Sequence, residues 1–584
     1  MTELLDRRYC FAWTLAVIAV TYLVMFAVLP KESIWISDEG NRIMSVQAYA
    51  LNGSKALPDP LNGITDIPSG IRAYPFPYFI RKNGQWRSAY QLFFPWLASW
   101  VYSDLGRTCT LFIAVLGGLL TVLGTGLLAR KLFGDDLHAS LAMALCAFCT
   151  PVWFYSGTFL ETTCASAFAV LSLRLLPEAK ESRSEFWKIF GSGLLAGISI
   201  LFREEGFVFA AGTGLALMIW YFSWKRVLAY GLGTALAVIP LLICNYVDST
   251  SIFGMHHLVY SQLPKAAGSF MKNQLLNYSF YLFLLCLPFW GQLNLVLPWV
   301  LLGSAGLAAV PKIRRPAECL FLSAAIVCCG ASAWCNIMTP HGGVFIYQSL
   351  LDHVPIFALF LLCLPVLFRS DRKEIRFLTM VTLAGIFLPP ALLNHDQPGM
   401  FWGGRHFLNI VPLLCILSVH LLLRTGEQLS RAVRTGGWLL IILSLAANAG
   451  GYAVLNAKRN FSAEYVRETA KPEYQVILTD MYWMPEELAW IHREKCVLLM
   501  LHADSLDQAR PFLRVNGIPK FHLLLGRNYR KITNESLRRT MAECDFKPGR
   551  HFSHPMFGFF ECQLFECTFR KPSGPWKNPK PAVK

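Results

Sequence analysis

The chain has 584 residues, of which 54% are apolar and only 15% are charged, and its mean hydropathy is +0.42. A soluble protein of this size carries roughly 25% charged residues. Here the apolar residues also come in blocks long enough to cross a bilayer, which excludes an ordinary soluble enzyme, a fibrous protein and a disordered chain. The net charge of +16 is spread over separate short loops, which argues against nucleic acid as a partner.

About thirteen segments approach the roughly 20 mostly apolar residues that a membrane-spanning helix needs. They lie near residues 10–29, 109–129, 138–156, 162–176, 189–202, 206–222, 227–247, 293–310, 317–337, 353–368, 377–393, 406–423 and 436–455. A further segment, 276–290, is short and aromatic, so we expect it to lie in the interface; a crossing there would change the count by one. The predicted fold class is an all-α polytopic membrane protein.

The basic residues predict the orientation of the chain. Lys and Arg gather in alternate loops, at residues 7–8, 130–131, 174–188, 225–226, 312–315, 369–376 and 424–434. Cytoplasmic loops carry such an excess of positive charge, so the N-terminus is predicted to be cytoplasmic and the chain beyond residue 455 to be outside. The first apolar run resembles a signal peptide, but no small-residue cleavage site follows it, so we expect a retained first helix.

Two stretches are predicted to lie outside the membrane: a long first loop, 31–108, and the C-terminal part. The C-terminal part contains strand-like runs at residues 475–479, 496–501, 521–525 and 559–565. Helical stretches separate the first three runs, which is typical of a small α/β domain. We therefore expect a transmembrane core, 1–455, an extracytoplasmic α/β domain, 456–572, and a disordered end, 573–584.

The cysteines and histidines do not form a metal-binding motif. Thirteen of the 17 cysteines lie in or beside apolar spans, where Cys behaves as a small hydrophobe. The other four are Cys496, Cys544, Cys562 and Cys567, and nothing in the sequence chooses among their three full pairings. Because no HExxH motif occurs and the one CxxC lies inside an apolar span, we expect no tightly specified metal site.

The first outer loop begins with an acidic pair, in the sequence Trp35-Ile-Ser-Asp38-Glu39-Gly40-Asn41-Arg42. Two adjacent carboxylates stand where the chain leaves the membrane. One interpretation is structural: Ser37 or Asp38 caps a helix over residues 41–51. The other is catalytic, because the loop continues through an aromatic, Pro-rich segment, 74–78, and an amphipathic stretch, 90–102, before it re-enters the membrane.

Further charged residues stand at predicted outer turns. They occur in Thr158-Phe-Leu-Glu161, Leu201-Phe-Arg203-Glu204-Glu205-Gly206 and Gly403-Gly404-Arg405-His406-Phe407. Arg405 offers a planar fork of donors suited to phosphate, although an interfacial Arg also reaches lipid headgroups.

Each of the other charged residues has a structural alternative. His406 fits a helix start as well as a ligand contact, and Glu161 favours a helix N-terminus whatever its function. The run Arg203-Glu204-Glu205 is costly at that depth unless it pairs or faces a wet cavity, so an ion pair within the run is the alternative to substrate contact. The histidines at 256, 257 and 341 are more often plain loop residues.

In their order and shared outer location, these motifs resemble the GT-C superfamily of membrane glycosyltransferases. The resemblance is to the branch with protein O-mannosyltransferases and the lipid A aminoarabinose transferase, and it covers residues 10–455. It implies a core of many helices, an acidic pair in a large first outer loop with two juxtamembrane helices, and location in a bacterial inner membrane. The C-terminal part resembles no domain that we can name.

The resemblance implies transfer of a sugar from a polyprenyl-phosphate donor to a lipid, glycan or protein acceptor on the outer membrane face, with inversion. Asp38 would be the general base and Glu39 a helper. Arg405, His406, Arg203, Glu204 and Glu161 would contact substrate, with Arg405 on the carrier phosphate. We expect no cofactor. An Asp-Glu pair in place of Asp-Asp argues against metal chelation by this loop, while a divalent metal elsewhere stays open.

Two other classes of function are compatible with a polytopic membrane protein. A secondary transporter would carry charges near the middle of the membrane and show two halves with related hydropathy. Here the charges lie at the outer ends and the halves do not match. An envelope polysaccharide ligase or polymerase also uses a lipid-linked sugar, but it would concentrate Arg and His in one long late outer loop. Both remain as alternatives.

Overall fold

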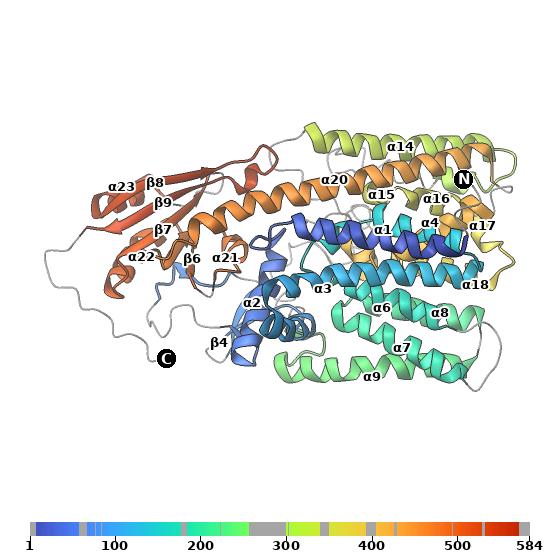
Figure 1. The fold of residues 1–584 in the computed structure, drawn as a ribbon, viewed down its shortest axis with the longest axis horizontal. Coiled ribbons are helices and arrows are strands. Elements are labelled where there is room, and N and C mark those ends of the chain that lie inside the picture. Colours follow the sequence, from blue (N-terminus) through green and yellow to red (C-terminus); the bar gives the residue numbers. More distant parts are fainter. Residues whose placement is uncertain are drawn as a thin grey trace.

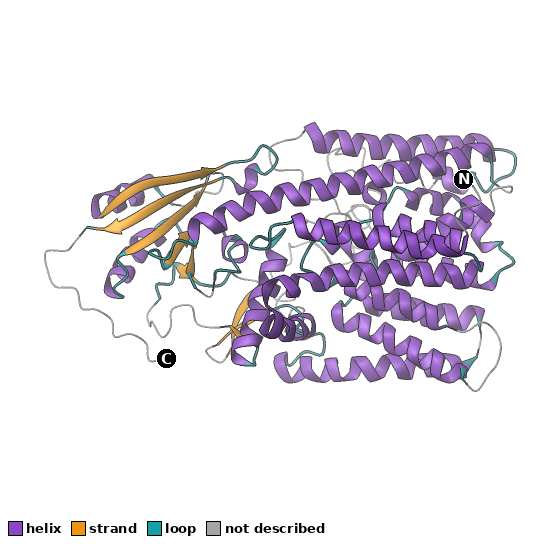
Figure 2. Ribbon diagram, viewed as in Figure 1, coloured by secondary structure: helices purple, strands orange, loops and turns teal. Residues whose placement is uncertain are grey.

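The structure is a computed structural model. It describes residues 7–57, 67–75, 78–82, 85–176, 184–221, 223–255, 300–301, 303–338, 350–392, 404–424, 429–492, 494–527 and 532–570. Long helices lie side by side in a bundle, and the C-terminal strands lie beyond one end of it (Figures 1 and 2). We call this end of the bundle, where residues 37–52 lie, the strand end, and the opposite end, which contains residues 128–134, the far end.

Five helices in the described parts of the chain are long and apolar enough to cross a membrane. They are α1 (Arg7–Val28), α3 (Phe93–Phe133), α7 (Glu185–Phe202), α9 (Trp224–Ser249) and α20 (Arg431–Thr469). Other helices complete the bundle: α4 (Asp136–Phe148), α5 (Val152–Ser156), α6 (Thr162–Leu175), α8 (Gly206–Trp220), α14 (Arg314–Met338), α15 (Leu350–His353), α16 (Ile356–Leu362), α17 (Leu364–Phe368), α18 (Lys373–Leu392), η1 (Arg405–Phe407), α19 (Val411–Val419) and η2 (His420–Arg424). The prediction of a mostly helical membrane protein is confirmed, while the count of about thirteen spans stays a prediction.

Two of the predicted spans are divided into shorter helices. Within 138–156, α4 and α5 are separated by a turn that contains Pro151. Within 353–368, α16 and α17 are separate helices, and Pro365 lies in the first turn of α17. Proline lacks the N–H that a continuous helix needs and clashes with the preceding turn, so it is placed where a new helix begins. The segment 276–290 lies outside the described residues.

The first outer loop contains the two predicted helical stretches. The first is α2 (Ser37–Asn52), and the second is the initial part of α3, residues 93–105. Gly106 divides α3 with φ 77° and ψ −173°, a conformation that is open almost only to glycine. Between the two stretches, β1 (Ala56–Leu57), β4 (Gln85–Ser88) and β3 (Phe79–Lys82) form a small antiparallel sheet in that order.

The C-terminal part and one strand of the first loop form a six-stranded mixed sheet, in the order β2-β6-β5-β7-β9-β8. Its strands are β2 (Ile71–Arg72), β5 (Val476–Thr479), β6 (Cys496–Met500), β7 (Lys520–Gly526), β8 (Cys544–Phe552) and β9 (Cys562–Phe569). Its helices are α21 (Met484–Glu487), α22 (Ser505–Val515), α23 (Asn534–Glu543) and η3 (Gly558–Phe560). The four predicted strand runs correspond to β5, β6, β7 and β9. Strand β8 was not predicted, because it contains Pro548 and is mostly exposed and so lacks the apolar pattern of a buried strand.

The first loop and the C-terminal part are joined into one structure. Strand β2 of the loop pairs with β6, with Ile71 opposite Met500. Helix α2 packs against α21, and α20 continues past the predicted boundary at residue 455 as far as Thr469. Both segments therefore lie at the strand end of the bundle (Figure 1). Because β2 and β6 are hydrogen-bonded in one sheet, the first loop and the C-terminal part lie on the same side of the membrane.

Candidate active site

Asp38 lies in the first turn of α2 and is bound by side chains from two distant segments. Arg405 Nη1 donates to Asp38 Oδ2 over 2.6 Å, and the Tyr90 hydroxyl donates to Asp38 Oδ1 over 2.7 Å. The N-cap of α2 is Ile36, which makes no side-chain cap. The capping interpretation of Ser37 and Asp38 is therefore wrong, because the helix begins earlier and its acidic side chain faces partners across the fold.

The electrostatic surroundings of Asp38 keep it ionised. Burial alone would raise the pKa of this carboxyl group, but the guanidiniums of Arg405 and Arg42 and the hydrogen bond from Tyr90 hold it well below its ordinary value. Arg42 donates to the backbone carbonyl of Asp38 over 3.0 Å and lies over the Tyr90 ring. The carboxylate is thus a fixed negative charge with both oxygens oriented.

Glu39 has a different set of partners from its neighbour. Its carboxylate accepts the Trp35 backbone N–H over 3.2 Å and pairs with Arg459 of α20 over 2.7 Å. Burial raises its pKa despite the opposing effect of Arg459. Next to this pair, Lys458 donates to both oxygens of Glu487 over 2.5 and 2.7 Å. Glu39 therefore fixes α2 to α20 and completes the N-terminal turn of its helix.

A chain of ion pairs extends from the acidic helix through three more segments. Arg42 binds both oxygens of Glu161, at 2.6 Å each. Arg203 reaches Glu161 over 3.2 Å and Glu205 over 2.5 and 2.9 Å. Glu205 also accepts from His406 Nδ1. The alternative of an ion pair within the run 203–205 is therefore confirmed, and that pair is part of a larger network.

The network brings together most of the residues that the sequence analysis selected. Asp38, Glu161, Arg203, Arg405 and His406 are all buried or nearly so and belong to it. They come from the start of α2, the start of α6, the turn between α7 and α8, and η1. These turns all face the strand end, so the fold places their charges in contact. The positive charges of three arginines balance the negative charges of three acids, and this pairing offsets the free-energy cost of burying them. The six residues are Arg42, Arg203, Arg405, Asp38, Glu161 and Glu205.

Glu204 is a predicted site residue that lies beside the network. It forms no ion pair with any residue that the structure describes. Burial raises the pKa of its carboxyl group to about 7, with a further contribution from Glu205, and a hydrogen bond with Gln91 opposes the change only partly. A carboxyl group with this pKa can hold or release a proton at neutral pH. The candidate histidines at 256, 257 and 341 lie outside the described residues.

Several residues of the site were missed in the sequence. Arg42 stands one helical turn after Asp38, a spacing that places both on one face of α2. Glu205 was noted only as part of the charged run. Tyr90, Lys458 and Arg459 carry no local signal, because their partners are distant in sequence and adjacent only in the fold.

Glu486 of α21 is a further missed acid. Its side chain is fully buried, and neither carboxylate oxygen has a hydrogen-bond partner in the described parts of the structure. Burial raises its pKa well above the ordinary value, and the nearby charges of Glu487 and Asp38 add to the effect. The backbone of Glu486 packs directly on Gly40 of α2. Burial and the neighbouring negative charges therefore favour the protonated form of this carboxyl group.

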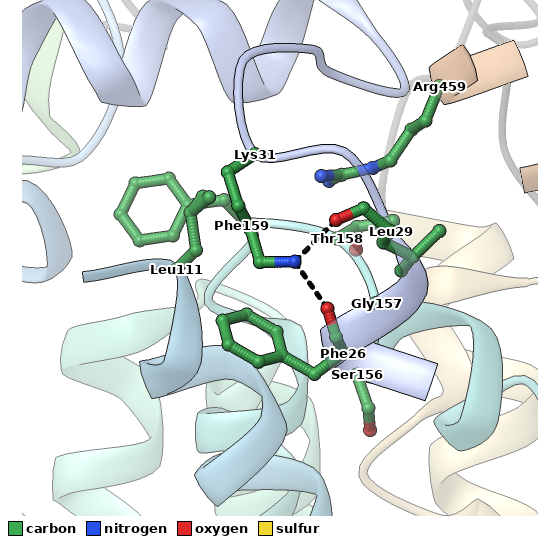
Figure 3. A pocket seen from close by; sticks show the side chains of 9 residues that line it. All are labelled: Phe26, Leu29, Lys31, Leu111, Ser156, Gly157, Thr158, Phe159 and Arg459. Atoms are coloured by element: carbon green, nitrogen blue, oxygen red, sulfur yellow. Dashed lines mark hydrogen bonds between the residues drawn. The ribbon is translucent and has the colours of Figure 1, made fainter. Parts of the chain in front are cut away.

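A small cavity lies between the C-terminal end of α1 and the turn that follows α5, and Figure 3 shows its lining residues. Lys31 Nζ donates to the backbone carbonyls of Phe26 and Leu29, and Arg459 lines the same cavity from α20. Lys31 thus satisfies carbonyl groups that the end of α1 leaves open. We assign it a structural role.

The described residues do not contain a group of three or more His, Cys, Asp and Glu side chains placed to hold a metal ion. Cys544, Cys562 and Cys567 are free thiols. The chemistry that the described site offers is therefore that of an oriented carboxylate, a neighbouring guanidinium and a titratable acid.

No family model matches the chain, and no curated protein matches it in sequence. Among solved structures, it is similar to ArnT from Cupriavidus metallidurans in the apo state, with a TM-score of 0.50 at 11% identity over 95% of this chain and 98% of ArnT. The structure of the same protein bound to undecaprenyl phosphate has a TM-score of 0.50 at 12% identity, over 94% and 97%. The oligosaccharyltransferase of Archaeoglobus fulgidus in the apo form has a TM-score of 0.47 at 13% identity, over 89% and 70%.

The likeness to ArnT extends over nearly the whole of both chains, and at this identity it establishes the fold. The resemblance to GT-C membrane proteins that the motifs predicted is confirmed at that level. With its apolar helices, the chain is an integral membrane protein of GT-C-like fold.

Proposed function

We propose that the protein is a membrane glycosyltransferase that moves a sugar from a polyprenyl-phosphate donor to an acceptor hydroxyl group. The observation that carries this proposal is the contact between Asp38 and Arg405, at 2.6 Å, in a fold shared with ArnT. It joins a proton acceptor and a phosphate-binding group that are 367 residues apart in the sequence. One of the similar ArnT structures holds undecaprenyl phosphate, which supports a polyprenyl phosphate as the carrier.

In the proposed reaction, the acceptor oxygen attacks the anomeric carbon while Asp38 takes its proton. The bond from the anomeric carbon to the phosphate oxygen breaks, and its electron pair stays on the carrier phosphate. Attack from the face opposite the leaving group inverts the anomeric centre. A positioned general base contributes about 10²- to 10⁴-fold to the rate of such a step.

Arg405 is proposed to bind the carrier phosphate. Its guanidinium has five N–H donors, so it is able to contact a phosphate while Nη1 stays near Asp38. Negative charge gathers on the phosphate as the sugar leaves, and a cation placed there stabilises the transition state. Phosphate bound beside Asp38 also offsets the effect of Arg405 on that carboxylate. Its pKa then rises, which makes Asp38 a stronger base when the donor is present.

The rest of the network is proposed to hold these two groups in position. Arg42, which lies next to Asp38, pairs with Glu161, and Arg203 connects Glu161 to Glu205. Glu205 in turn binds His406, the residue that follows Arg405. Glu204 is not bound into this chain of ion pairs. We propose it as the acid that contacts the sugar or acceptor, because it exchanges a proton near neutral pH.

The location and topology complete the proposal. The enzyme would lie in a bacterial inner membrane, with the N-terminus in the cytoplasm and the strand end outside. The acceptor would be a lipid, glycan or protein at that outer surface. The positive loops at the far end support this orientation.

Mass spectrometry of envelope glycans, lipids and lipid-linked sugars, in cells with and without the gene, tests the activity. Loss of one glycoconjugate together with accumulation of its lipid-linked donor is the expected result. Complementation with Asp38→Asn should fail to restore the product, whereas Asp104→Asn, an exposed carboxylate of the α3 segment before Gly106, should restore it. An unchanged envelope with altered uptake of a solute would contradict the proposal and favour a transporter.

A further inference from the structure

The far end of the bundle contains a cavity of about 450 Å³ that the proposed reaction does not use. It lies among the ends of α3, α6, α7, α8, α9 and α18. The candidate active site is at the opposite, strand end (Figure 1). The volume of the far-end cavity is within the range of roughly 300–1,000 Å³ that is usual for sites that bind small molecules.

The walls of the cavity are apolar and its charged residues are mostly basic. Leu128, Phe133, Leu217, Phe377 and Leu378, all buried, form much of the wall. The charged lining residues are Lys131, Arg226, Arg372 and Glu374. With three cations and one carboxylate, the cavity favours an anionic group that is attached to an apolar one.

The basic residues come from loops that are far apart in the sequence. Lys131 lies in the last turn of α3, Arg226 lies in the first turn of α9, and Arg372 directly precedes α18. Each belongs to a different group of basic residues in the sequence, at 130–131, 225–226 and 369–376. The preference of cytoplasmic loops for positive charge explains why these groups lie at one end of the bundle. It does not require them to surround one apolar cavity.

The contacts of these cations orient them, and the contacts of the two arginines do not use all of their donors. Lys131 Nζ donates to the carbonyl of Arg174 over 3.1 Å, and Arg372 donates to the carbonyl of Leu132 over 2.8 Å. Arg226 pairs with Glu185 over 2.5 Å. A guanidinium has five N–H donors, so Arg226 and Arg372 retain capacity for a phosphate in addition to these partners.

We infer that this cavity binds the phosphate head of an anionic lipid together with the first part of its acyl chain. Basic pockets between membrane helices bind anionic lipid headgroups in this way. A free phosphate would meet the cations but leave the apolar walls without a partner, and a zwitterionic lipid would bring its own cation to a basic rim. The inference is independent of the proposed reaction, because it rests on residues at the other end of the bundle.

Native mass spectrometry of the purified full-length protein tests the inference by titration with phosphatidylglycerol, phosphatidylcholine or inorganic phosphate. Phosphatidylglycerol should bind at least tenfold more tightly than phosphatidylcholine. Inorganic phosphate should fail to displace it at equal concentration. The double variant Lys131→Gln/Arg372→Gln should lose roughly 10- to 30-fold in affinity for phosphatidylglycerol, as expected for two cations near a lipid phosphate.

A matched control is Lys225→Gln/Arg369→Gln. These two cations belong to the basic groups 225–226 and 369–376, but they are exposed and do not line the cavity. It should bind phosphatidylglycerol as the native chain does. Leu217→Trp keeps every charge but fills the cavity, and it should also lose the lipid. Thermal unfolding in phosphatidylcholine reports whether each variant is folded.

Labelling of the unmodified protein gives a test that needs no variant. A photoactivatable phosphatidylglycerol should label peptides that contain residues 128–134 or 373–378. Equal affinity for both lipids, equal loss in the control variant, displacement by inorganic phosphate, or labelling confined to other helices would each overturn the inference.

Discussion

Asp38 and Arg405 form a buried pair whose two members have different proposed tasks. Removal of either charge leaves the other without its partner, so single substitutions change two properties at once. Binding of the carrier and the rate of transfer therefore have to be measured separately for each variant.

Asp38→Asn should lower the rate of sugar transfer by about 10²- to 10⁴-fold, because the amide keeps the shape of the side chain but cannot accept the proton. Affinity for undecaprenyl phosphate should be unchanged or tighter, since Arg405 then has no competing carboxylate. Steady-state kinetics with a lipid-linked sugar and binding of undecaprenyl phosphate measure the two quantities. If the variant retained most of its rate, Asp38 would not be the base, and Glu204 would be tested next.

Arg405→Gln should weaken binding of undecaprenyl phosphate by roughly 10- to 100-fold, the value of a charge-assisted hydrogen bond of about 1.5–3 kcal/mol. Because this variant leaves Asp38 buried without its cation, Asp38→Asn/Arg405→Gln removes both charges and serves as the folded comparison. Arg431→Gln, an exposed arginine at the start of α20, is the control. Equal affinity in all three proteins would exclude Arg405 from phosphate binding.

Glu486 should make stability depend on pH. Its folded-state pKa is raised above the ordinary 4.5, so its contribution to stability is fully present below that pH and is lost as the pH rises through the folded-state pKa. Glu486→Gln cannot ionise, so its apparent Tm relative to the native chain should rise between pH 4.5 and 8. Thermal unfolding at several pH values measures this. Exposed Glu494→Gln should show no such trend, and a flat difference for Glu486→Gln would contradict the assignment.

At the scale of elements, Gly106 determines how the juxtamembrane part of α3 joins its membrane-spanning part. Gly106→Ala should destabilise the protein by about 1–3 kcal/mol, because φ 77° with ψ −173° is strained for any residue with a Cβ. Gly231→Ala in α9 is the comparison, since open space surrounds that position and Ala favours a helix. Thermal unfolding in detergent should show a lower Tm for the first variant only.

Contacts between elements also explain what was missed around Asp38. Helix α2 was predicted, and its acidic pair was selected as a site candidate, because two adjacent carboxylates can be recognised from the sequence itself. Tyr90, Arg459 and Glu486 bind or face this helix from positions 52 to 448 residues later in the chain. Such pairings depend on how helices pack, and a single sequence carries no local pattern for them.

At the scale of the whole molecule, the first loop and the C-terminal sheet lie on one side, because β2 pairs with β6 and α2 packs on α21. Single cysteines at Asn52 and Glu535 should therefore both react with an impermeant maleimide in intact cells. A cysteine at Lys225, at the far end, should react only after permeabilisation. Reaction at 52 with protection at 535 would contradict the shared side and require a further crossing between them.

The sequence alone determined the class of protein, most of the helices, four of the C-terminal strands and the charged turns that form the site. These features follow from hydropathy and from the chemistry of neighbouring residues, which act over short distances along the chain. Three features became apparent only in the folded chain: which charges pair, that Asp38 binds Arg405 instead of capping its helix, and that β2 joins the C-terminal sheet. The physical reason is that a buried charge takes its partner from whichever segment packs against it, and packing brings together residues hundreds of positions apart.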